Sequence, residues 1–331
     1  MTAITYCNLG LAIAPIRREI DNAIAGCIDQ SSFLHGFQTR TFEEEWAAFC
    51  GQQYAVCCNS GTDALTLAAT ALGLQSVRIP ANTLPLTGIG LFRGGARVNI
   101  AEINAEGWMA MPGGDAVPVL IYGRIPAETA CTRMLYDAAH AHGWKPPAEA
   151  IAAWSFYPTK TLGAFGDGGA VTTNDADLAA TMRELCGRDD RLHDRRQITS
   201  RMDEIQAAVL RVKLRHLPEW LDDRKEIGQL YDQRLEQLGI SLKGKSLHHL
   251  YVIRTRYRDG LMAWLARHDI GCKIHWAKAL HRVPGPWEHN GHYPESEKWA
   301  DSILSLPCYP GLKTSEINRV CDAVEEYYAT Q

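Results

Sequence analysis

Short apolar runs alternate with helix-forming segments between Tyr54 and Thr173, and this alternation restricts the fold more than any other feature of the chain. Each run has the length of a single strand, whereas the alanine- and leucine-rich segment Ala64–Leu72 has the composition of a helix and stops at Gly73. Strands in alternation with helices predict a three-layer α/β fold, in which helices cover both faces of a mostly parallel sheet. The predicted strands are Tyr54–Cys58, Val77–Ile79, Val98–Ile100, Val117–Tyr122, Met134–Tyr136, Ala152–Tyr157 and Ala170–Thr173.

An N-terminal helix precedes the first of these strands. The residues Thr41 to Glu44 fit a capping box, which predicts a helix over Glu43–Cys50. Gly51 follows it directly, in the position where a glycine commonly ends a helix.

The pattern changes in the C-terminal part of the chain. Ser200–Asp203 resembles a capping box, and residues 205–212 carry apolar side chains at helical spacing. A further strand is expected at Leu250–Thr255. A chain of 331 residues is long enough for two lobes, with a single large α/β domain as the alternative. We expect a large domain over residues 1–217 and a smaller C-terminal α+β domain over residues 218–331.

Composition excludes several classes of protein. The net charge of −4, counted with neutral histidines, argues against a nucleic-acid surface built on bulk positive charge. The run from Arg188 to Arg196 mixes arginines with aspartates and is predicted to be a solvated or substrate-facing loop. The ten cysteines include no C-x-x-C pair, which favours a reducing compartment. No secretory signal and no apolar run of membrane-spanning length is evident, so we expect a cytoplasmic protein.

The histidines do not predict a metal site. His248, His249, His275 and His281 lack the spacing of known zinc ligands. We expect the first two in a loop or at a strand edge, and the other two at the rim of an active site.

A turn between a strand and a helix, Ser60-Gly61-Thr62, is a candidate phosphate site. Glycine allows the backbone to approach a ligand closely, and the start of a helix offers unpaired N–H groups to an anion. In isolation, Ser60 with Asp63 is equally well explained as a simple helix cap.

Asp137 ends the apolar run Met134–Tyr136. Ligands of open α/β sheets bind at the carboxyl ends of the strands, and a carboxylate there can keep a pyridine nitrogen protonated. The alternative is an aspartate that caps the segment following it.

Lys160 lies between an apolar strand and a glycine-rich turn, surrounded in sequence by aromatic residues. Desolvation lowers the pKa of an ammonium group and frees the amine to form a Schiff base, although most lysines are simply exposed on surfaces. Ser155, five residues earlier, is placed to bind a phosphate. The glycines of Gly163–Gly169 precede a strand and do not match a dinucleotide-binding fingerprint, so they are expected to let the backbone pass close to the lysine.

The order of phosphate turn, ring-nitrogen acid and lysine is the pattern of fold-type I pyridoxal-phosphate enzymes. Over nearly its whole length the chain resembles the sugar aminotransferase family named after DegT, DnrJ and StrS. The stretches that carry the resemblance are Asn59–Leu65, Ile79–Thr83, Tyr136–Gly143, Ser155–Gly163, Gly166–Ala170 and Ser200–Leu210.

The resemblance implies a fold of the aspartate-aminotransferase type and pyridoxal 5'-phosphate as cofactor. By similarity, Lys160 is the Schiff-base lysine and proton carrier, Asp137 pairs with the pyridine nitrogen, and His140 lies near the ring hydroxyl. Gly61, Thr62 and Ser155 then bind the phosphate, and Ser60 is a further residue of the cofactor site.

The resemblance also implies a homodimer in which each active site is completed by the neighbouring subunit. Two positions depart from the family pattern. Leu84 stands where an aromatic residue often stacks on the cofactor, and Thr199 stands where an asparagine usually reaches the partner's phosphate. Both residues are still expected at the cofactor site, Thr199 at that of the partner subunit.

The reaction implied by the resemblance transfers an amino group from glutamate to a ketone on a nucleotide-linked sugar. A sugar dehydratase is disfavoured, because such relatives carry histidine at the position of Lys160. A cyclitol aminotransferase acting on an inosose, and a catalytically silent homologue with a binding or regulatory role, remain as alternatives.

Overall fold

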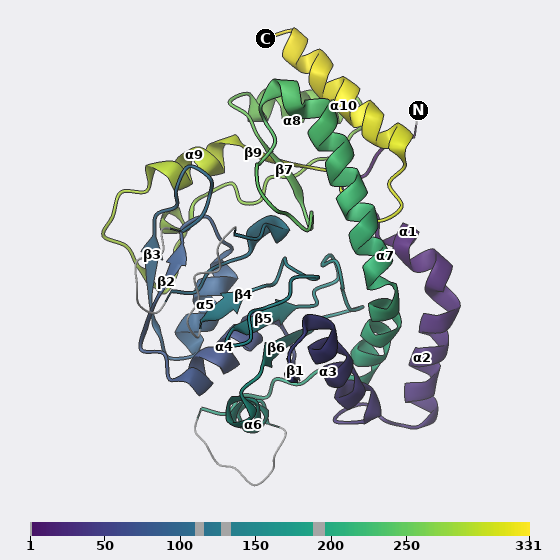
Figure 1. Cartoon of the computed structure of the whole chain (residues 1–331), viewed down its shortest axis with the longest axis vertical. Coiled ribbons are helices and arrows are strands. Elements are labelled where there is room, and N and C mark those ends of the chain that lie inside the picture. The colour runs from purple at the N-terminus through teal and green to yellow at the C-terminus, as the bar shows by residue number, and fades with distance from the viewer. Residues whose placement is uncertain (1, 110–115, 127–133, 188–195) are drawn as a thin grey trace.

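The computed structural model describes residues 2–109, 116–126, 134–187 and 196–331. The predicted loop Arg188–Arg196 therefore lies almost entirely outside the described residues. Figure 1 shows the arrangement of the helices and strands. The helices are α1 (Leu9–Ile13), α2 (Arg17–Asp29), α3 (Phe37–Cys50), α4 (Gly61–Leu72), α5 (Pro85–Arg93), α6 (Ala176–Leu185), α7 (Glu204–Leu235), α8 (Arg258–Arg267), α9 (Pro294–Ser302) and α10 (Thr314–Ala329). The strands are β1 (Tyr54–Cys58), β2 (Ser76–Pro80), β3 (Arg97–Ala101), β4 (Leu135–Asp137), β5 (Ile151–Ser155), β6 (Gly169–Thr173), β7 (Tyr251–Arg254), β8 (Trp287–Glu288) and β9 (Ile303–Leu306).

The main sheet is mostly parallel. Its strands form two groups, in the orders β1-β6-β5-β4 and β2-β3-β8. The segment between the groups forms parallel bridges to both, through Ala116 to Arg78 and through Val119 to Asp137. Only β6 runs against its neighbours β1 and β5 within these two groups of described strands. The prediction of an α/β fold with a mostly parallel sheet is therefore confirmed.

Helices cover both faces of this sheet, because side chains of a strand point alternately to its two sides. In β5, Ala152 and Trp154 enter a core with α2, α3 and α7, whereas Ile151 and Ala153 enter a second core with α4, α5 and α6. A strand buried on both faces must be apolar along its whole length. This requirement explains why the strands read as continuous apolar runs.

The predicted strand Val117–Tyr122 is not observed as a strand, and within it only Val119 forms an isolated bridge. Residues Ile121–Gly123 form a 3-10 turn, in which Tyr122 has a φ of 63°. Pro118 has no N–H group to donate, and the left-handed conformation at Tyr122 turns the chain out of the sheet. The Tyr122 hydroxyl then donates to the carbonyl of His275, 2.6 Å away.

The predicted start of the N-terminal helix is also wrong. Helix α3 begins at Phe37, one turn before the expected capping box, and Gly36 offers no side-chain cap. Its first N–H groups are instead bound by a residue far away in sequence. The carboxylate of Glu204 accepts from the N–H groups of Gln38 and Thr39, at 2.8 and 2.9 Å. The end of the helix at Gly51, which has a φ of 75°, is as predicted.

Helix α7 runs without interruption through the expected domain boundary. Its first half, as far as Trp220, packs into the core beneath the main sheet. From Ile227 to Leu235 it packs into a separate core with β7, β9, α8 and α10. The strand predicted at Leu250–Thr255 is observed as β7, paired antiparallel with β9. Thus the core changes along one helix rather than across a linker.

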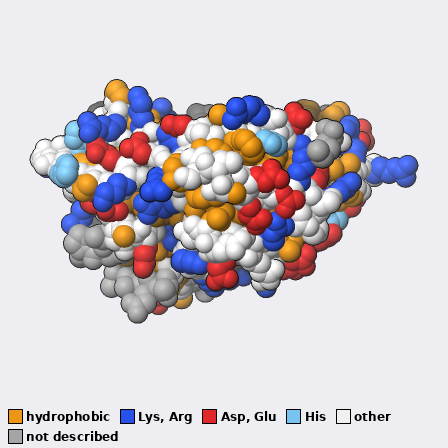
Figure 2. Space-filling model, turned by 90° about the horizontal axis from the view of Figure 1, so that it is seen from above, with side chains coloured by type: hydrophobic (Ala, Val, Ile, Leu, Met, Phe, Trp, Pro, Cys, Tyr) orange, Lys and Arg blue, Asp and Glu red, His pale blue; other side chains and the backbone are white. Residues whose placement is uncertain are grey.

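The surface carries both signs of charge. On the face seen from above, Lys and Arg side chains are interspersed with Asp and Glu (Figure 2). Among the described residues, no helix combines the length and apolar character needed to cross a membrane. All cysteines among the described residues are free thiols.

Candidate active site

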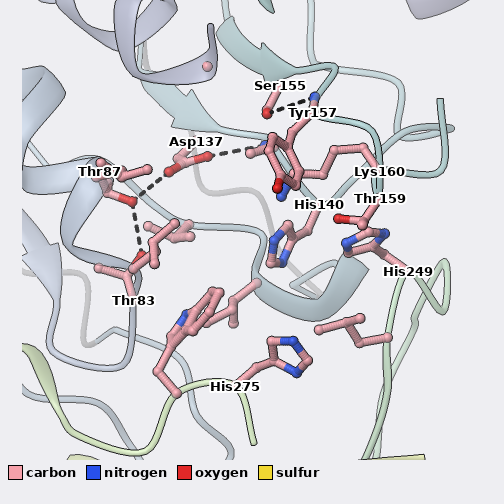
Figure 3. A pocket seen from close by; sticks show the side chains of 18 of the residues that line it. Thr83, Thr87, Asp137, His140, Ser155, Tyr157, Thr159, Lys160, His249 and His275 are labelled. Atoms are coloured by element: carbon pink, nitrogen blue, oxygen red, sulfur yellow. Dashed lines mark hydrogen bonds between the residues drawn. The ribbon is translucent and has the colours of Figure 1, made fainter. Parts of the chain in front are cut away.

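A cavity of about 490 Å³ lies at the carboxyl ends of β4 and β5. Its walls contain every residue predicted to be catalytic or to bind the cofactor except Thr199. One wall, here called the sheet wall, consists of Ser60–Thr62, Asp137, Ser155 and Lys160. A second group of lining residues, here called the far wall, consists of Tyr6, Arg224, His249, Lys273 and His275. Figure 3 shows Asp137, His140 and Lys160 pointing into the same space, with His275 across it from Ser155.

The start of α4 forms one end of the sheet wall. Ser60 caps the helix, since its Oγ accepts from the N–H of Asp63 at 3.1 Å. The first N–H groups of a helix have no partner within the helix, which leaves those of Gly61 and Thr62 for a ligand. A Cβ atom at Gly61 would lie 2.7 Å from the Cβ of Ser155, so only glycine permits this approach. The cap and the anion cradle are therefore both present in the same turn.

Asp137 is held at the end of β4, with 6% of its surface exposed. Its carboxylate accepts from the Thr87 hydroxyl at 2.7 Å and from the N–H of Ala139 at 3.1 Å. Burial raises the pKa of Asp137, and these two donors together with Lys160 lower it in part. A buried carboxylate that lines a cavity favours a cationic partner there, because such a partner offsets its desolvation.

Lys160 lies on the turn that follows β5. Burial lowers the pKa of its ammonium group to about 8, and the Asp137 carboxylate acts in the opposite direction. The turn is closed by backbone bonds from Lys160 to Tyr157 and from Ala164 to Phe156, both at 2.8 Å. An amine with this pKa is partly neutral near neutral pH and is therefore nucleophilic.

The Lys160 turn is also fixed from beneath. His142 accepts from the N–H of Leu162 at 3.0 Å through Nδ1, and Lys213 donates to the carbonyl of Gly163. Burial lowers the pKa of His142 to about 3, so the ring is neutral and can accept. Neither His142 nor Lys213 was identified from the sequence, because both act through backbone atoms rather than on a ligand.

Histidines surround the amine of Lys160. His140 accepts from the N–H of Tyr122 at 3.1 Å through Nδ1, and its ring centre is 4.5 Å from that of His249. His249 shares a hydrogen bond with Thr161 at 3.3 Å. Burial lowers the pKa of His140 and His249 well below the usual value, and that of His275 to about 4. The rings in the cavity are therefore neutral.

Of the two histidines predicted at the rim of the active site, one lines the cavity and the other does not. His275 lines the cavity, as expected of a rim residue, whereas His281 does not and binds Glu297 at 2.9 Å. His249, expected in a loop or at a strand edge, is a cavity residue that sequence reasoning missed. Its neighbour His248 does not line this cavity.

Leu84 and Thr199 lie in different settings. Leu84 immediately precedes α5 and lines the cavity. Thr199 is exposed and is not part of the wall of the cavity in its own chain. Within the described residues, no cluster of three or more His, Cys, Asp or Glu side chains is arranged to hold a metal ion.

Comparison with known proteins identifies relatives over nearly the whole chain. A transaminase of Streptomyces venezuelae, named dTDP-3-amino-3,4,6-trideoxy-alpha-D-glucose transaminase, is 34% identical, and the match covers 98% of this chain and 96% of the relative. UDP-2-acetamido-2-deoxy-3-oxo-D-glucuronate aminotransferase of Pseudomonas aeruginosa is 28% identical, with 97% and 99% covered.

Among solved structures, S. venezuelae DesV in complex with a ketimine intermediate superposes with a TM-score of 0.92. It is 32% identical, and the match covers 99% of both chains. A family model, described as the DegT/DnrJ/EryC1/StrS aminotransferase family, matches residues 15–114 and 127–325. The chain belongs to this aminotransferase family.

Proposed function

We propose that the protein is a pyridoxal-phosphate-dependent aminotransferase that moves an amino group from glutamate to a keto group of a nucleotide-linked sugar. The observation that carries the proposal is the position of Asp137 and Lys160 in one cavity, beside the anion cradle at the start of α4. A carboxylate, an amine and an anion site together match the ring nitrogen, the aldehyde and the phosphate of this cofactor.

The residues present fit the cofactor. Gly61, Thr62 and Ser155 would bind the phosphate, with Ser60 holding the turn, and Leu84 would pack on the ring. His140 would lie near the ring hydroxyl. When bound, the cofactor supplies an electron sink that stabilises negative charge on the substrate carbon.

The chain's own groups carry the proton transfers. Lys160 would hold the aldehyde carbon covalently and, once displaced by the substrate amine, would take a proton from the substrate carbon and deliver it to the former aldehyde carbon. Asp137 would keep the pyridine nitrogen protonated through a charge-assisted hydrogen bond. The neutral histidines of the cavity add no positive charge that would compete for this carboxylate.

The substrate class is proposed from relatives. The two transaminases described above are named for amino sugars linked to dTDP or for a keto sugar linked to UDP. A cyclitol acceptor is the alternative that shares the same chemistry.

We further propose an aspartate-aminotransferase-like division into residues 1–217 and 218–331, and a homodimer in which Thr199 reaches the partner's cofactor. The change of core between Trp220 and Ile227 supports the division. Leu86 and Tyr157 line the cavity yet are 46% and 53% exposed, which supports a second chain completing the site.

The experiment that tests the proposal is cofactor binding by Lys160→Ala. The unaltered protein should turn yellow with pyridoxal phosphate, and borohydride should bleach it and attach the cofactor to Lys160. The variant should take up no covalent cofactor and lose transamination by at least about a thousandfold. Lys278→Ala is the matched control, since Lys278 is exposed and outside the cavity. Protein that stays colourless with added cofactor would contradict the proposal and favour a silent homologue.

A further inference from the structure

The far wall of the cavity contains two cations for which the cofactor has no use. From them we infer a separate anion subsite, formed by Arg224 and Lys273, that takes a carboxylate or phosphate group of the substrate. The inference rests on the proposed function, because it assigns a part of the same cavity to the substrate.

Arg224 is the buried half of this subsite. It extends from α7 to the cavity with only 5% of its surface exposed. Its Nη1 donates to the carbonyls of His248, His249 and Cys308, at 3.1, 3.0 and 2.7 Å. Backbone carbonyls fix the position of the guanidinium group but do not neutralise its charge. Among the described residues, no carboxylate pairs with Arg224, its Nη2 donates to no group, and its buried Nε has no hydrogen-bond partner.

Lys273 is the exposed half of the subsite. Its backbone is fixed to Ser305 by two hydrogen bonds of 3.1 and 2.7 Å, and its side chain lines the cavity. In the part of the chain that the structure describes, it forms no ion pair. Both cations are attached to the same short segment, since Lys273 binds Ser305 of β9 and Arg224 binds the carbonyl of Cys308 three residues later.

The surroundings of these cations favour an anionic ligand. Asp137 and Asp167 are the acidic side chains among the described lining residues, and Asp137 belongs to the sheet wall. Burial and the charge of Lys273 both lower the pKa of His275, so this ring is neutral, and it shares a hydrogen bond with Ser305 at 2.9 Å. A buried guanidinium without a counter-ion recovers its desolvation cost when a carboxylate or phosphate binds. The phosphate cradle lies beside Ser155, and Figure 3 shows Ser155 across the cavity from His275. His275 is two residues from Lys273 and shares its partner Ser305, so we assign this anion to the substrate rather than to the cofactor phosphate.

Two substrate groups have the required chemistry, namely the carboxylates of the amino donor and the diphosphate of a nucleotide. Unreactive probes separate them, glutarate for the first and inorganic diphosphate for the second. Equilibrium binding of each probe is measured on the cofactor-loaded protein, in which the cofactor phosphate occupies the cradle on the sheet wall. Lys273→Met should raise the dissociation constant of at least one probe about three- to fivefold and reduce its dependence on salt. Arg224→Met should raise it about ten- to hundredfold.

Lys278→Met is the matched control, because Lys278 is exposed and close in sequence to Lys273 but outside the cavity lining. Loss of glutarate binding alone assigns the subsite to the donor, loss of diphosphate binding alone assigns it to the nucleotide, and loss of both supports a shared anion subsite. Unchanged binding of both probes in Lys273→Met, relative to Lys278→Met, overturns the inference even if Arg224→Met fails to fold. Cofactor uptake is read separately by absorbance, so its failure would count against the proposed function alone.

Discussion

The two walls of the cavity are built in different ways. The sheet wall comes from the last residues of β4 and β5 and from short segments just after β1 and β5, so its residues are brought together at one edge of the sheet. The far wall combines Tyr6, Arg224 and His275, which lie on segments far apart in the chain and come together only through packing. The difference suggests a division of work, in which the sheet wall binds the cofactor and the far wall binds the substrate.

The largest expected effect is the loss of turnover when Asp137 of the sheet wall is replaced. Asp137→Asn replaces the carboxylate by a neutral amide, which cannot hold a pyridine nitrogen protonated. We expect turnover to fall by about a thousandfold, while borohydride still attaches the cofactor to Lys160. The measurements are steady-state rate and mass of the reduced protein. A variant that retains more than about a tenth of the activity would show that this wall does not control the chemistry.

The next effect is on the pH dependence of stability, and it concerns Lys213, which binds the turn that carries Lys160. Burial lowers the pKa of Lys213 to about 8 from its ordinary value of 10.5. Between these two pH values the unfolded chain binds more protons than the folded one, so stability rises with pH there. Lys213→Met should remove that rise, which amounts to about 3 kcal/mol of unfolding free energy. Denaturant unfolding of the cofactor-loaded protein, repeated at several pH values from about 7.5 to about 10.5, measures this change in unfolding free energy with pH. A parallel pH dependence in both proteins would contradict the prediction, and Lys278→Met should behave like the unaltered protein.

A smaller effect is expected from the glycine of the phosphate turn. The added Cβ of Gly61→Ala would lie 2.7 Å from the Cβ of Ser155, so one of the two segments must move. We expect the unfolding free energy to fall by about 1–3 kcal/mol, together with weaker cofactor binding. Gly26→Ala is the matched control, because nothing lies within 4 Å of its added Cβ in α2. That control should gain about 0.5–1 kcal/mol, and equal effects of both substitutions would rule out a packing constraint at Gly61.

The smallest effect should come from the far wall. His275→Ala removes one neutral polar ring, whose hydrogen bonds are worth about 1 kcal/mol each. We expect the KM of a substrate to rise about two- to tenfold, while the affinity for the cofactor is unchanged. Steady-state kinetics and cofactor titration measure the two quantities. If cofactor affinity falls while KM stays constant, the division of work between the walls is wrong.

The sequence predicted the main sheet and the sheet wall well, for a physical reason. In a parallel sheet, the residues at and just after the carboxyl end of each strand meet at one edge, so the local pattern predicted that Asp137 and Lys160 lie at that edge. Family resemblance then supplied the roles that remain proposals.

Features that depend on distant contacts were not predictable in this way. Helix α3 begins before its apparent capping box because Glu204, far along the chain, binds its first N–H groups. The chain leaves the sheet at Tyr122 because this residue contacts His140 and His275. His249 was missed for the same reason, since its neighbours in sequence carry no sign of the cavity it faces.

Helix α7 connects the two walls mechanically. Lys213 binds the Lys160 turn, and Arg224, three helical turns later, binds the carbonyl of His249. At 1.5 Å per residue, about 16 Å of helix separates these two attachments. Pro218 lies between them and lacks the N–H group that would bind the carbonyl of Leu214. Bending of α7 between its two attachments therefore breaks one backbone hydrogen bond fewer than bending elsewhere in the helix. Such bending would move Arg224 relative to Lys213 without breaking either attachment.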